Sequence, residues 1–298
     1  MLKQLCGVAR LNFLSLSLLC VALAATASWQ AGQGLSVGSL LLVTAIALCA
    51  HISVNALNEY QDFKSGLDFL TKRTPFSGGS GTLITYPEAA YPALWLAVIS
   101  LLLVISGGLY LSYQLNWQPL LIGIPGVALI YGYTRYVNRW PLLCLLAPGL
   151  GFGVFMLLGS YWVLAGSISA GAWLLALIVT LLVSNLLLLN QFPDVEADRQ
   201  VGRRHLPIVI GRRHSASVYT LLLLLSYLLL IAGVISGILP WQCLLGLLSL
   251  GLAVKLLPGL FRYADKPEQL SRYLGLNVLL CHLYPLLLLA GLLWAGPA

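Results

Sequence analysis

Long apolar runs alternate with short polar segments along the entire chain. Each run contains about 20 residues, the length that a helix needs to cross a bilayer. Hydropathy predicts nine such spans, near residues 11–30, 36–57, 89–113, 118–137, 141–165, 170–190, 216–238, 241–260 and 273–294. The predicted fold is therefore all-α, a polytopic membrane bundle of about nine transmembrane helices.

The connections between these spans alternate in charge. Segments 31–35, 114–117, 166–169 and 239–240 contain no Lys or Arg, so all 16 basic residues fall on the other side of the bundle. By the positive-inside rule that side is cytoplasmic, which predicts a multi-pass protein of the cell inner membrane with its N-terminus inside and its C-terminus outside. The net charge of +7 follows from this topology. The lipid bilayer is therefore an expected partner, and nucleic acid is not.

The composition agrees with this fold class. Hydrophobic residues make up 59% of the chain and charged residues 8%, whereas soluble proteins carry about 25% charged residues. The six cysteines are scattered without a Cys-x-x-Cys pair, so neither a disulfide framework nor a zinc site is expected. One alternative remains for the first span. Lys3, Arg10 and the small residues at 25–27 also fit a cleaved secretory signal, which would leave eight spans.

Six of the nine acidic residues lie in two short segments, 59–68 and 194–198. Each segment follows a predicted span on the basic side, and four crossings separate them, so both lie on the same side of the membrane. Residues three or four apart share one helix face. At that spacing the chain carries two polar stripes: His51, Asn55, Asn58 and Asp62, and then Asn190, Asp194 and Asp198.

These stripes have two possible explanations. A single carboxylate at a helix end is most often a solvated cap. Two matched stripes of amide and carboxylate oxygens instead favour a hard cation such as Mg²⁺, which prefers oxygen ligands and shares its shell with phosphates. Converging carboxylates would also repel one another without a cation. For His51, packing between helices is favoured over a role beside the stripe.

Three basic connections could bind an anion. Lys72 and Arg73 precede Ser77-Gly78-Gly79-Ser80-Gly81, a run with exposed backbone N–H groups that could cradle phosphate or could be a flexible connection. Arg199 directly follows Asp198. Tyr131 and Arg135 lie on the third connection, where an aromatic membrane anchor is the alternative. Metal, cations and an apolar bundle together suit a ligand with a diphosphate head and a long hydrocarbon tail.

The two acidic motifs resemble those of the UbiA superfamily of membrane prenyltransferases, over nearly the whole chain. The matching residues are Asn58, Asp62 and Gly66-x-Asp68, with Asn190-x-x-x-Asp194-x-x-x-Asp198 as the second motif. Glu59 stands where the 4-hydroxybenzoate enzymes have Asp. That variant is similar to the 1,4-dihydroxy-2-naphthoate polyprenyltransferases of the menaquinone branch. The resemblance implies one domain, residues 1–298, with a central cavity that opens to the cytoplasmic face.

The resemblance also implies an activity. It is the Mg²⁺-dependent transfer of a polyprenyl group from polyprenyl diphosphate to an aromatic acceptor, most closely 1,4-dihydroxy-2-naphthoate with loss of CO₂. Two Mg²⁺ sites are implied, with the ligands Asn58, Asp62 and Asp68, and Asn190, Asp194 and Asp198; their four aspartates are the expected catalytic residues. The expected substrate-binding residues are Asn55, Lys72, Arg73, Tyr131, Arg135 and Arg199, with Arg135 at a position where the family has Lys.

Two other functions remain open at this stage. A 4-hydroxybenzoate or other aromatic prenyltransferase would share the metal sites and differ in the acceptor. An ion-coupled transporter is a different class, because acids inside membrane proteins often mark ion pathways. Transporters place such acids near mid-span and in inverted repeats. Here the acids lie at one face and an even number of crossings apart, which disfavours transport.

Overall fold

The computed structural model describes residues 1–74 and 76–297, and these residues form helices and connecting turns without any strand. The α-helices are α1 (Leu2–Val8), α2 (Leu14–Gln30), α3 (Val37–Ser65), α4 (Leu67–Leu70), α5 (Thr82–Thr85), α6 (Ala90–Gln114), α7 (Leu120–Gly132), α8 (Pro141–Gly149), α9 (Gly159–Ala165), α10 (Ala170–Asn190), α11 (Val195–Gln200), α12 (Leu206–Ile235), α13 (Leu250–Tyr263) and α14 (Ser271–Ala295). A π-helical segment (Leu150–Leu158) joins α8 to α9, and 3₁₀ turns lie at Leu11–Phe13, Pro87–Ala89, Val137–Arg139, Trp241–Ser249 and Pro267–Gln269.

Eight helices in the described ranges are long and apolar enough to cross a membrane, so the prediction of a multi-pass membrane bundle is confirmed. The predicted span at 118–137 is shorter than expected, because α7 has only 13 residues. It ends at Gly132, and the following residues turn through Val137–Arg139 rather than continuing the helix. Hydropathy alone could not place this end, since Tyr133, Tyr136 and Val137 are mixed with polar residues after Gly132.

The two polar stripes are built differently. α3 continues past the predicted end at residue 57 to Ser65, so the whole first stripe lies on one helix, which Gly66 ends with a φ of 80°. The second stripe does not lie on one helix, contrary to the sequence prediction. α10 ends at Asn190, a turn follows, and α11 begins at Val195. Pro193 lies in that turn, and proline both lacks an N–H donor and disfavours a helical residue before it.

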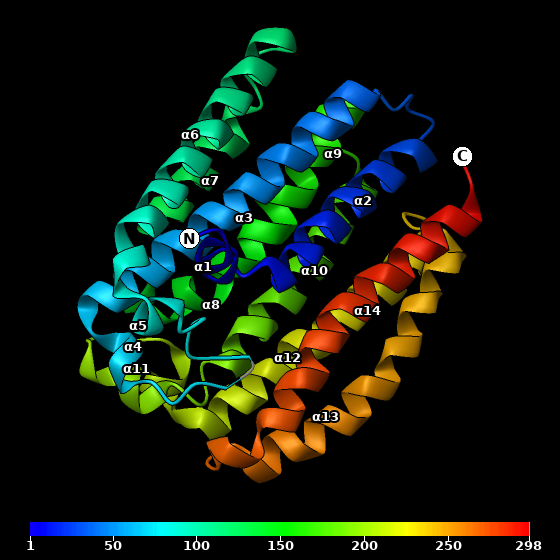
Figure 1. The fold of residues 1–298 in the computed structure, drawn as a ribbon. Coiled ribbons are helices and arrows are strands. Elements are labelled where there is room, and N and C mark those ends of the chain that lie inside the picture. Colours follow the sequence, from blue (N-terminus) through cyan, green and yellow to red (C-terminus); the bar gives the residue numbers. More distant parts are fainter. Residues whose placement is uncertain (75, 298) are drawn as a thin grey trace.

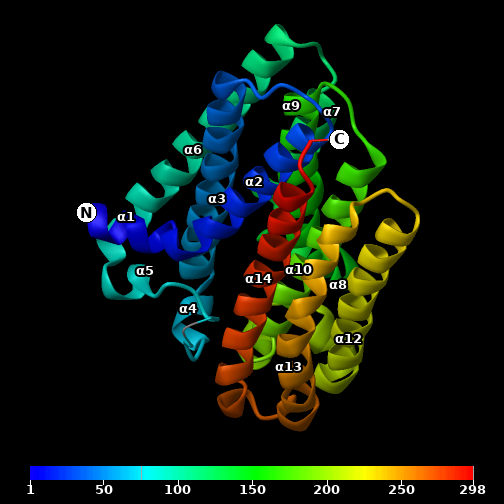
Figure 2. The same ribbon diagram turned by 90° about the vertical axis from the view of Figure 1, so that its right-hand side faces the viewer.

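α10 is the centre of the bundle. Its apolar window is 78% buried, against 17% for the peripheral segment Pro87–Gln114 that contains α6. Side chains of α2, α12, α13 and α14 pack with α10 in the main core, while α3, α6 and α7 form the opposite side of the molecule (Figures 1 and 2). Serine side chains cap α3 and α10, through Ser36 and Ser169, at the ends remote from the acidic segments.

The broken helix α8–α9 packs closely against α10. A Cβ atom on Gly153 would overlap the carbonyl oxygen of Ala176 and the hydroxyl of Thr180, and Gly149 approaches the carbonyl of Thr180 in the same way. Small residues four apart allow two helix backbones to come together in a membrane. The π-helical segment thus rests on the core helix with one face and leaves its other face for the cavity described below.

The short elements gather at one end of the bundle. α4, α5 and α11 lie near the ends of α3 and α10, at the lower left of Figure 1, and α1 runs across the bundle rather than along it (Figure 2). These elements carry or adjoin both acidic motifs and the Gly-rich segment. The fold therefore brings the polar parts of the sequence to a single end.

We expect Gly153→Ala to destabilise the protein in detergent by about 1–3 kcal/mol, because the added methyl group forces α8–α9 away from α10. Gly251→Ala is the matched control, since a Cβ atom there meets nothing within 4 Å. Thermal unfolding of both variants, followed by loss of monodisperse protein, measures the effect. Equal stability of the two variants would contradict the close packing.

Candidate functional site

A cavity of about 640 Å³ opens between α3, α6, α7 and the broken helix α8–α9. Its walls are apolar over most of their length, with contributions from side chains such as Ile46, Val104, Ile122, Phe155 and Val163. Its polar residues gather at the end where α4, α11 and the Gly-rich segment lie. A ligand that fits this space has a polar head and an apolar body.

All six predicted metal ligands line this cavity: Asn58, Asp62, Asp68, Asn190, Asp194 and Asp198. Asn55 lines it as well, and its side-chain amide donates to the carbonyl oxygen of Ala9 at 3.1 Å. The fold therefore brings together two acidic motifs that are about 130 residues apart in the sequence. Their roles in metal and substrate binding stay predictions.

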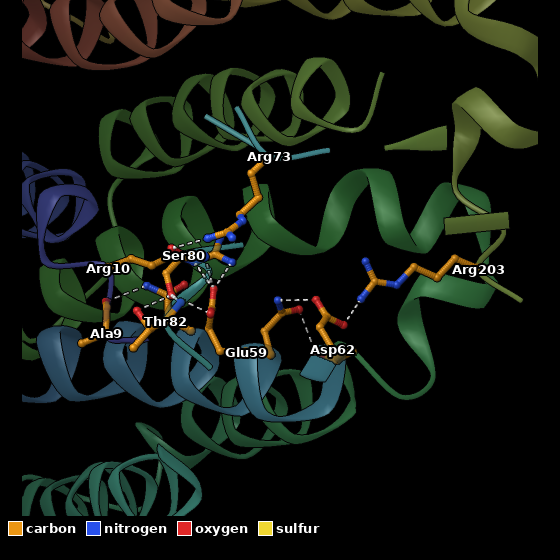
Figure 3. Close-up of polar contacts among 11 residues, drawn as sticks. Ala9, Arg10, Glu59, Asp62, Arg73, Ser80, Thr82 and Arg203 are labelled. Carbon is orange, nitrogen blue, oxygen red and sulfur yellow. Dashed lines mark hydrogen bonds and ion pairs between the residues drawn. The ribbon is translucent and has the colours of Figure 1, made fainter. Parts of the chain in front are cut away.

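Arg203 joins the two motifs. Its guanidinium donates from Nη1 to Asp198 Oδ1 at 3.0 Å. It also donates from Nη2 to Asp62 Oδ1, the contact drawn in Figure 3. Gly202, with a φ of 79°, reverses the chain after α11, and the Arg203 N–H donates to the Asp198 carbonyl at 3.0 Å. This turn directs the Arg203 side chain back over the acidic residues. One guanidinium thus offsets two of the clustered charges.

Asp62 and Asp198 have further partners. Asn58 Nδ2 donates to Asp62 Oδ2 at 2.8 Å, and the hydroxyl of Thr134 donates to Asn58 Oδ1 at 3.0 Å. His205 is buried, and its Nε2 lies 2.9 Å from Asp198 Oδ2. Carboxylates that bind metals are commonly held by such outer hydrogen bonds. These contacts fix the orientation of both aspartates.

Three other oxygens of the site are buried without a hydrogen-bond partner among the described residues: Asp68 Oδ2, Asn190 Oδ1 and Asp194 Oδ1. Leaving such acceptors unsatisfied is costly, whereas a hard cation would satisfy them. Within the described ranges, no three Asp, Glu, His or Cys side chains form a complete metal site by themselves. The donors therefore fit an oxygen-bound divalent cation whose shell is completed by amide oxygens and by phosphate.

Burial and mutual repulsion make two of these carboxyl groups hard to ionise. Burial, together with the charges of Glu59 and Asp62, raises the pKa of Asp68 to about 7. Burial and the charge of Asp198 raise the pKa of Asp194 to about 7. A carboxyl group with such a pKa is half protonated near neutral pH, so a cation that binds there displaces protons.

The Gly-rich segment lies directly on the acidic cluster. Ser77, Gly78 and Gly79 line the cavity, where the Gly78 N–H and the Ser77 hydroxyl favour the ionised form of Asp194. Gly79 has a φ of 74°, and a Cβ atom on it would lie 3.1 Å from Asp68 Oδ1. Glycine is therefore needed here both for its backbone conformation and for the close approach.

Five of the predicted substrate-binding residues do not line the cavity: Lys72, Arg73, Tyr131, Arg135 and Arg199. Lys72 donates to Glu268 at 2.6 Å in an exposed pair, and Arg199 lies 3.4 Å from Glu196. Tyr131 is exposed on α7, and Arg135 stacks 5.5 Å from the ring of Tyr136. These side chains lie around the mouth or at the surface of this structure.

Several cavity residues were not selected in the sequence analysis, among them Arg10, Tyr133, Arg203 and His205. Arg10 was counted only as a topological charge, and Tyr133 lies two residues from the chosen tyrosine. Arg203 was passed over in favour of Arg199, the direct neighbour of Asp198. The glycine at 202 is the sequence signal that could have identified Arg203, since it allows the chain to reverse after α11.

His51 both packs between helices and faces the cavity. Its Nδ1 lies 2.7 Å from the buried Ser17 hydroxyl of α2, and its ring contacts Phe152 edge-on at 5.0 Å between centroids. It also lines the cavity above Asn55. The contacts with Ser17 and Phe152 agree with the interpretation of His51 as a residue packed between helices.

Comparison with known proteins identifies a family and several relatives that match most of the chain. The model of the "UbiA prenyltransferase family" matches residues 17–294. The chain is 28% identical over 201 residues to "1,4-dihydroxy-2-naphthoate octaprenyltransferase" of Bacillus subtilis, a match that covers 65% of this chain and 62% of the relative. It is 26% identical over 287 residues to "2-carboxy-1,4-naphthoquinone phytyltransferase" of Synechocystis, covering 93% and 86% of the two chains.

Solved structures share the fold. A UbiA homolog from Aeropyrum pernix K1 superposes with a TM-score of 0.71 at 18% identity, covering 93% of this chain and 97% of the other. A UbiA homolog from Archaeoglobus fulgidus, bound to DMAPP and Mg²⁺, has a TM-score of 0.59 at 14% identity and covers 96% and 99%. The arrangement of helices is therefore one that solved membrane proteins adopt.

The raised pKa values of Asp68 and Asp194 predict pH-dependent metal binding. With a pKa of about 7, both carboxyl groups are mostly neutral below pH 7 and would have to lose a proton to bind a cation, so we expect the affinity for Mg²⁺ to rise with pH. We expect a gain of about tenfold per pH unit from about pH 5.5 to pH 7 and a plateau above. Calorimetric titration of the purified protein with Mg²⁺ measures this. Asp194→Asn should flatten the dependence, and a constant affinity in the unsubstituted protein would contradict it.

Proposed function

Because the chain belongs to the UbiA prenyltransferase family, we propose that it transfers a polyprenyl group from polyprenyl diphosphate to 1,4-dihydroxy-2-naphthoate, with loss of CO₂. One observation carries the proposal. Two sets of carboxylate and amide oxygens meet at the polar end of an otherwise apolar cavity, and several of these oxygens lack a partner. Such a cavity suits a diphosphate head and a hydrocarbon tail.

UbiA-family prenyltransferases use Mg²⁺, and an Archaeoglobus relative binds it together with DMAPP. In this chain Asn58, Asp62 and Asp68 would hold one ion, and Asn190, Asp194 and Asp198 the other. When bound, Mg²⁺ neutralises the diphosphate and makes it a better leaving group. The unpartnered oxygens of Asp68, Asn190 and Asp194 support this assignment.

The protein's own groups supply the remaining parts of the mechanism. Arg203 lies between the two motifs, where its fixed positive charge can stabilise the departing diphosphate. The apolar walls exclude water, which would otherwise capture the allylic cation that forms when the C–O bond ionises. With water excluded, attack of the aromatic ring on the allylic cation is faster than hydrolysis of the cation.

Support for the naphthoate acceptor is of two kinds. Curated relatives with naphthoate or naphthoquinone names match the chain at 25–28% identity. Glu59, in place of the Asp of the 4-hydroxybenzoate enzymes, also matches that branch. A 4-hydroxybenzoate acceptor remains the alternative, and it differs in the reaction because no carboxylate is lost.

We further propose that the polar end of the bundle faces the cytoplasm, because the connections predicted on that side contain Lys and Arg and the connections on the other side contain none. In a background without native cysteines, a cysteine at Gln200 should react with an impermeant thiol reagent only from the cytoplasmic side. A cysteine at Gln33 should react only from the outside, since it lies in a loop at the other end. Reaction of both positions from the same side would contradict the orientation.

Metal dependence is the first test of the activity. We expect transfer from a radiolabelled prenyl diphosphate to stop in EDTA and to return with Mg²⁺. Asp62→Asn and Asp194→Asn should each lower kcat/KM by about 10²–10³-fold, because each removes charge stabilisation of the leaving diphosphate.

Glu196→Gln is the matched control for these substitutions. Glu196 lies between Asp194 and Asp198 in the sequence, but its side chain is 65% exposed and does not line the cavity. The kcat/KM of Glu196→Gln should stay within about twofold of that of the unsubstituted protein, because substitutions at the surface usually have small effects. Full activity in EDTA, or in either Asp→Asn variant, would show that the site is assigned wrongly.

The acceptor is tested separately. The second ring of 1,4-dihydroxy-2-naphthoate adds four carbons, worth up to about 3 kcal/mol if they are fully buried, or around a hundredfold in kcat/KM. We expect this acceptor to be at least about tenfold better than 4-hydroxybenzoate and to release CO₂ with each transfer. Competition between the two acceptors, with ¹⁴CO₂ collected from carboxyl-labelled naphthoate, measures both. A higher kcat/KM with 4-hydroxybenzoate than with 1,4-dihydroxy-2-naphthoate would show that the naphthoate assignment is wrong.

A further inference from the structure

Glu59 follows Asn58 in the first motif, yet it does not line the cavity. Its side chain is 1% exposed and accepts four hydrogen bonds (Figure 3). Arg10 donates to Oε1 from Nε at 2.9 Å and from Nη2 at 2.5 Å. The Ser80 N–H donates to Oε1 and the Ser80 hydroxyl to Oε2, each at 2.7 Å. The donors of Arg10 and Ser80 thus occupy both oxygens of this carboxylate, which does not line the cavity.

Arg10 reaches Glu59 through an unusual backbone turn. It is the one non-glycine residue of the described chain with a positive φ, at 50°, and it separates α1 from α2. Residues other than glycine adopt this conformation at a cost, and they keep it where the surroundings impose it. The turn directs the Arg10 side chain under the Gly-rich segment, where Arg10 also lines the cavity.

The Gly-rich segment is attached to the first motif through Ser80, whose N–H and hydroxyl both donate to Glu59 of α3. Next to this attachment, a Cβ atom on Gly79 would lie 3.1 Å from Asp68 Oδ1, 3.4 Å from Glu59 Oε1 and 3.8 Å from Arg10 Nη2. Ser77, Gly78 and Gly79 line the cavity. The segment Ser77–Ser80 therefore crosses the polar end of the cavity like a strap that Glu59 holds at one end.

A buried ion pair is a poor means of gaining stability, because desolvation of the charges offsets much of their attraction. What such a pair provides is geometry, since a carboxylate with several fixed donors holds them in one arrangement. Here the donors come from the N-terminal turn and from the Gly-rich segment. The position of the segment over the metal-binding oxygens thus depends on Glu59.

We propose that Glu59 and Arg10 are a positioning pair that holds the segment Ser77–Ser80 across the cavity mouth, and so sets the affinity for the diphosphate end of the prenyl substrate. The inference rests on the proposed function for its substrate. Glu59 touches neither metal nor substrate; it acts through Ser80 and Arg10. Its extra methylene relative to Asp is what allows one carboxylate to contact both Arg10 and Ser80.

Limited trypsin digestion tests the strap without any activity assay. Lys72 and Arg73 precede the segment, and Lys72 is 83% exposed. In Glu59→Gln the carboxylate charge is lost, so cleavage after these residues should accelerate by about tenfold or more, because local opening governs proteolysis. Cleavage after the exposed Arg213 of α12 reports any general loosening and should not change. Glu88→Gln, an exposed glutamate on the same side, is the control variant.

Steady-state kinetics test the consequence. In Glu59→Gln the KM for prenyl diphosphate should rise by about tenfold, while the KM for the acceptor changes by less than about twofold. Glu59→Asp keeps the charge, but its shorter side chain cannot contact both Arg10 and Ser80. Its KM for prenyl diphosphate should therefore lie between those of the unsubstituted protein and Glu59→Gln. Arg10 and Glu59 act through one contact, so their effects should not add. The KM for prenyl diphosphate of the double variant Arg10→Gln/Glu59→Gln should be no higher than that of the more impaired single variant.

The outcomes separate the two proposals. Unchanged trypsin cleavage in Glu59→Gln, or a fall in kcat with both KM values unchanged, would overturn the positioning role and leave the proposed function intact. If the unsubstituted protein does not use prenyl diphosphates, the proposed function fails, and the digestion still decides whether Glu59 holds the strap. If Glu59→Gln does not fold, the rate of trypsin cleavage and the KM for prenyl diphosphate are measured in Glu59→Asp instead.

Discussion

Clustered negative charge at the end of an apolar bundle is the constraint on which the rest of the structure depends. Carboxylates that converge in a poorly solvated place repel one another, and each needs a partner. The chain supplies one through Arg203, which contacts both Asp62 and Asp198, and leaves oxygens of Asp68 and Asp194 open. The site is thus only partly neutralised by the protein itself. That incomplete balance is the basis on which we propose that the site binds cations and, through them, phosphate.

The helical bundle could be read from the sequence because the underlying physics is local. Hydrocarbon excludes unpaired backbone groups, so long apolar runs must be helices, and basic residues mark one side. The first polar stripe was predicted correctly because it lies on one unbroken helix, α3. The second was not, because Pro193 lies inside the stripe, where the helix ends. The helix α7 was predicted too long, because hydropathy does not detect where a helix gives way to a turn.

The candidate site shows the same division. Its acidic residues could be listed from spacing alone, since amide and carboxylate side chains are rare in membrane helices. Its basic partners could not, because which arginine reaches the cluster depends on backbone turns. Gly202 reverses the chain and brings Arg203, rather than Arg199, to Asp198. The turn at Arg10 likewise brings a residue from the start of the chain to Glu59.

The shortness of α7 has a consequence for the surrounding lipid. Thirteen helical residues extend only about 20 Å, whereas the hydrocarbon core of a bilayer is about 30 Å thick. Where α7 meets lipid, the membrane has to thin, or neighbouring polar groups have to extend toward the headgroups, and either adjustment costs energy for each ångström of mismatch. This wall of the cavity is therefore sensitive to acyl-chain length, and membrane thickness becomes a physical variable that acts on the protein alongside its substrates.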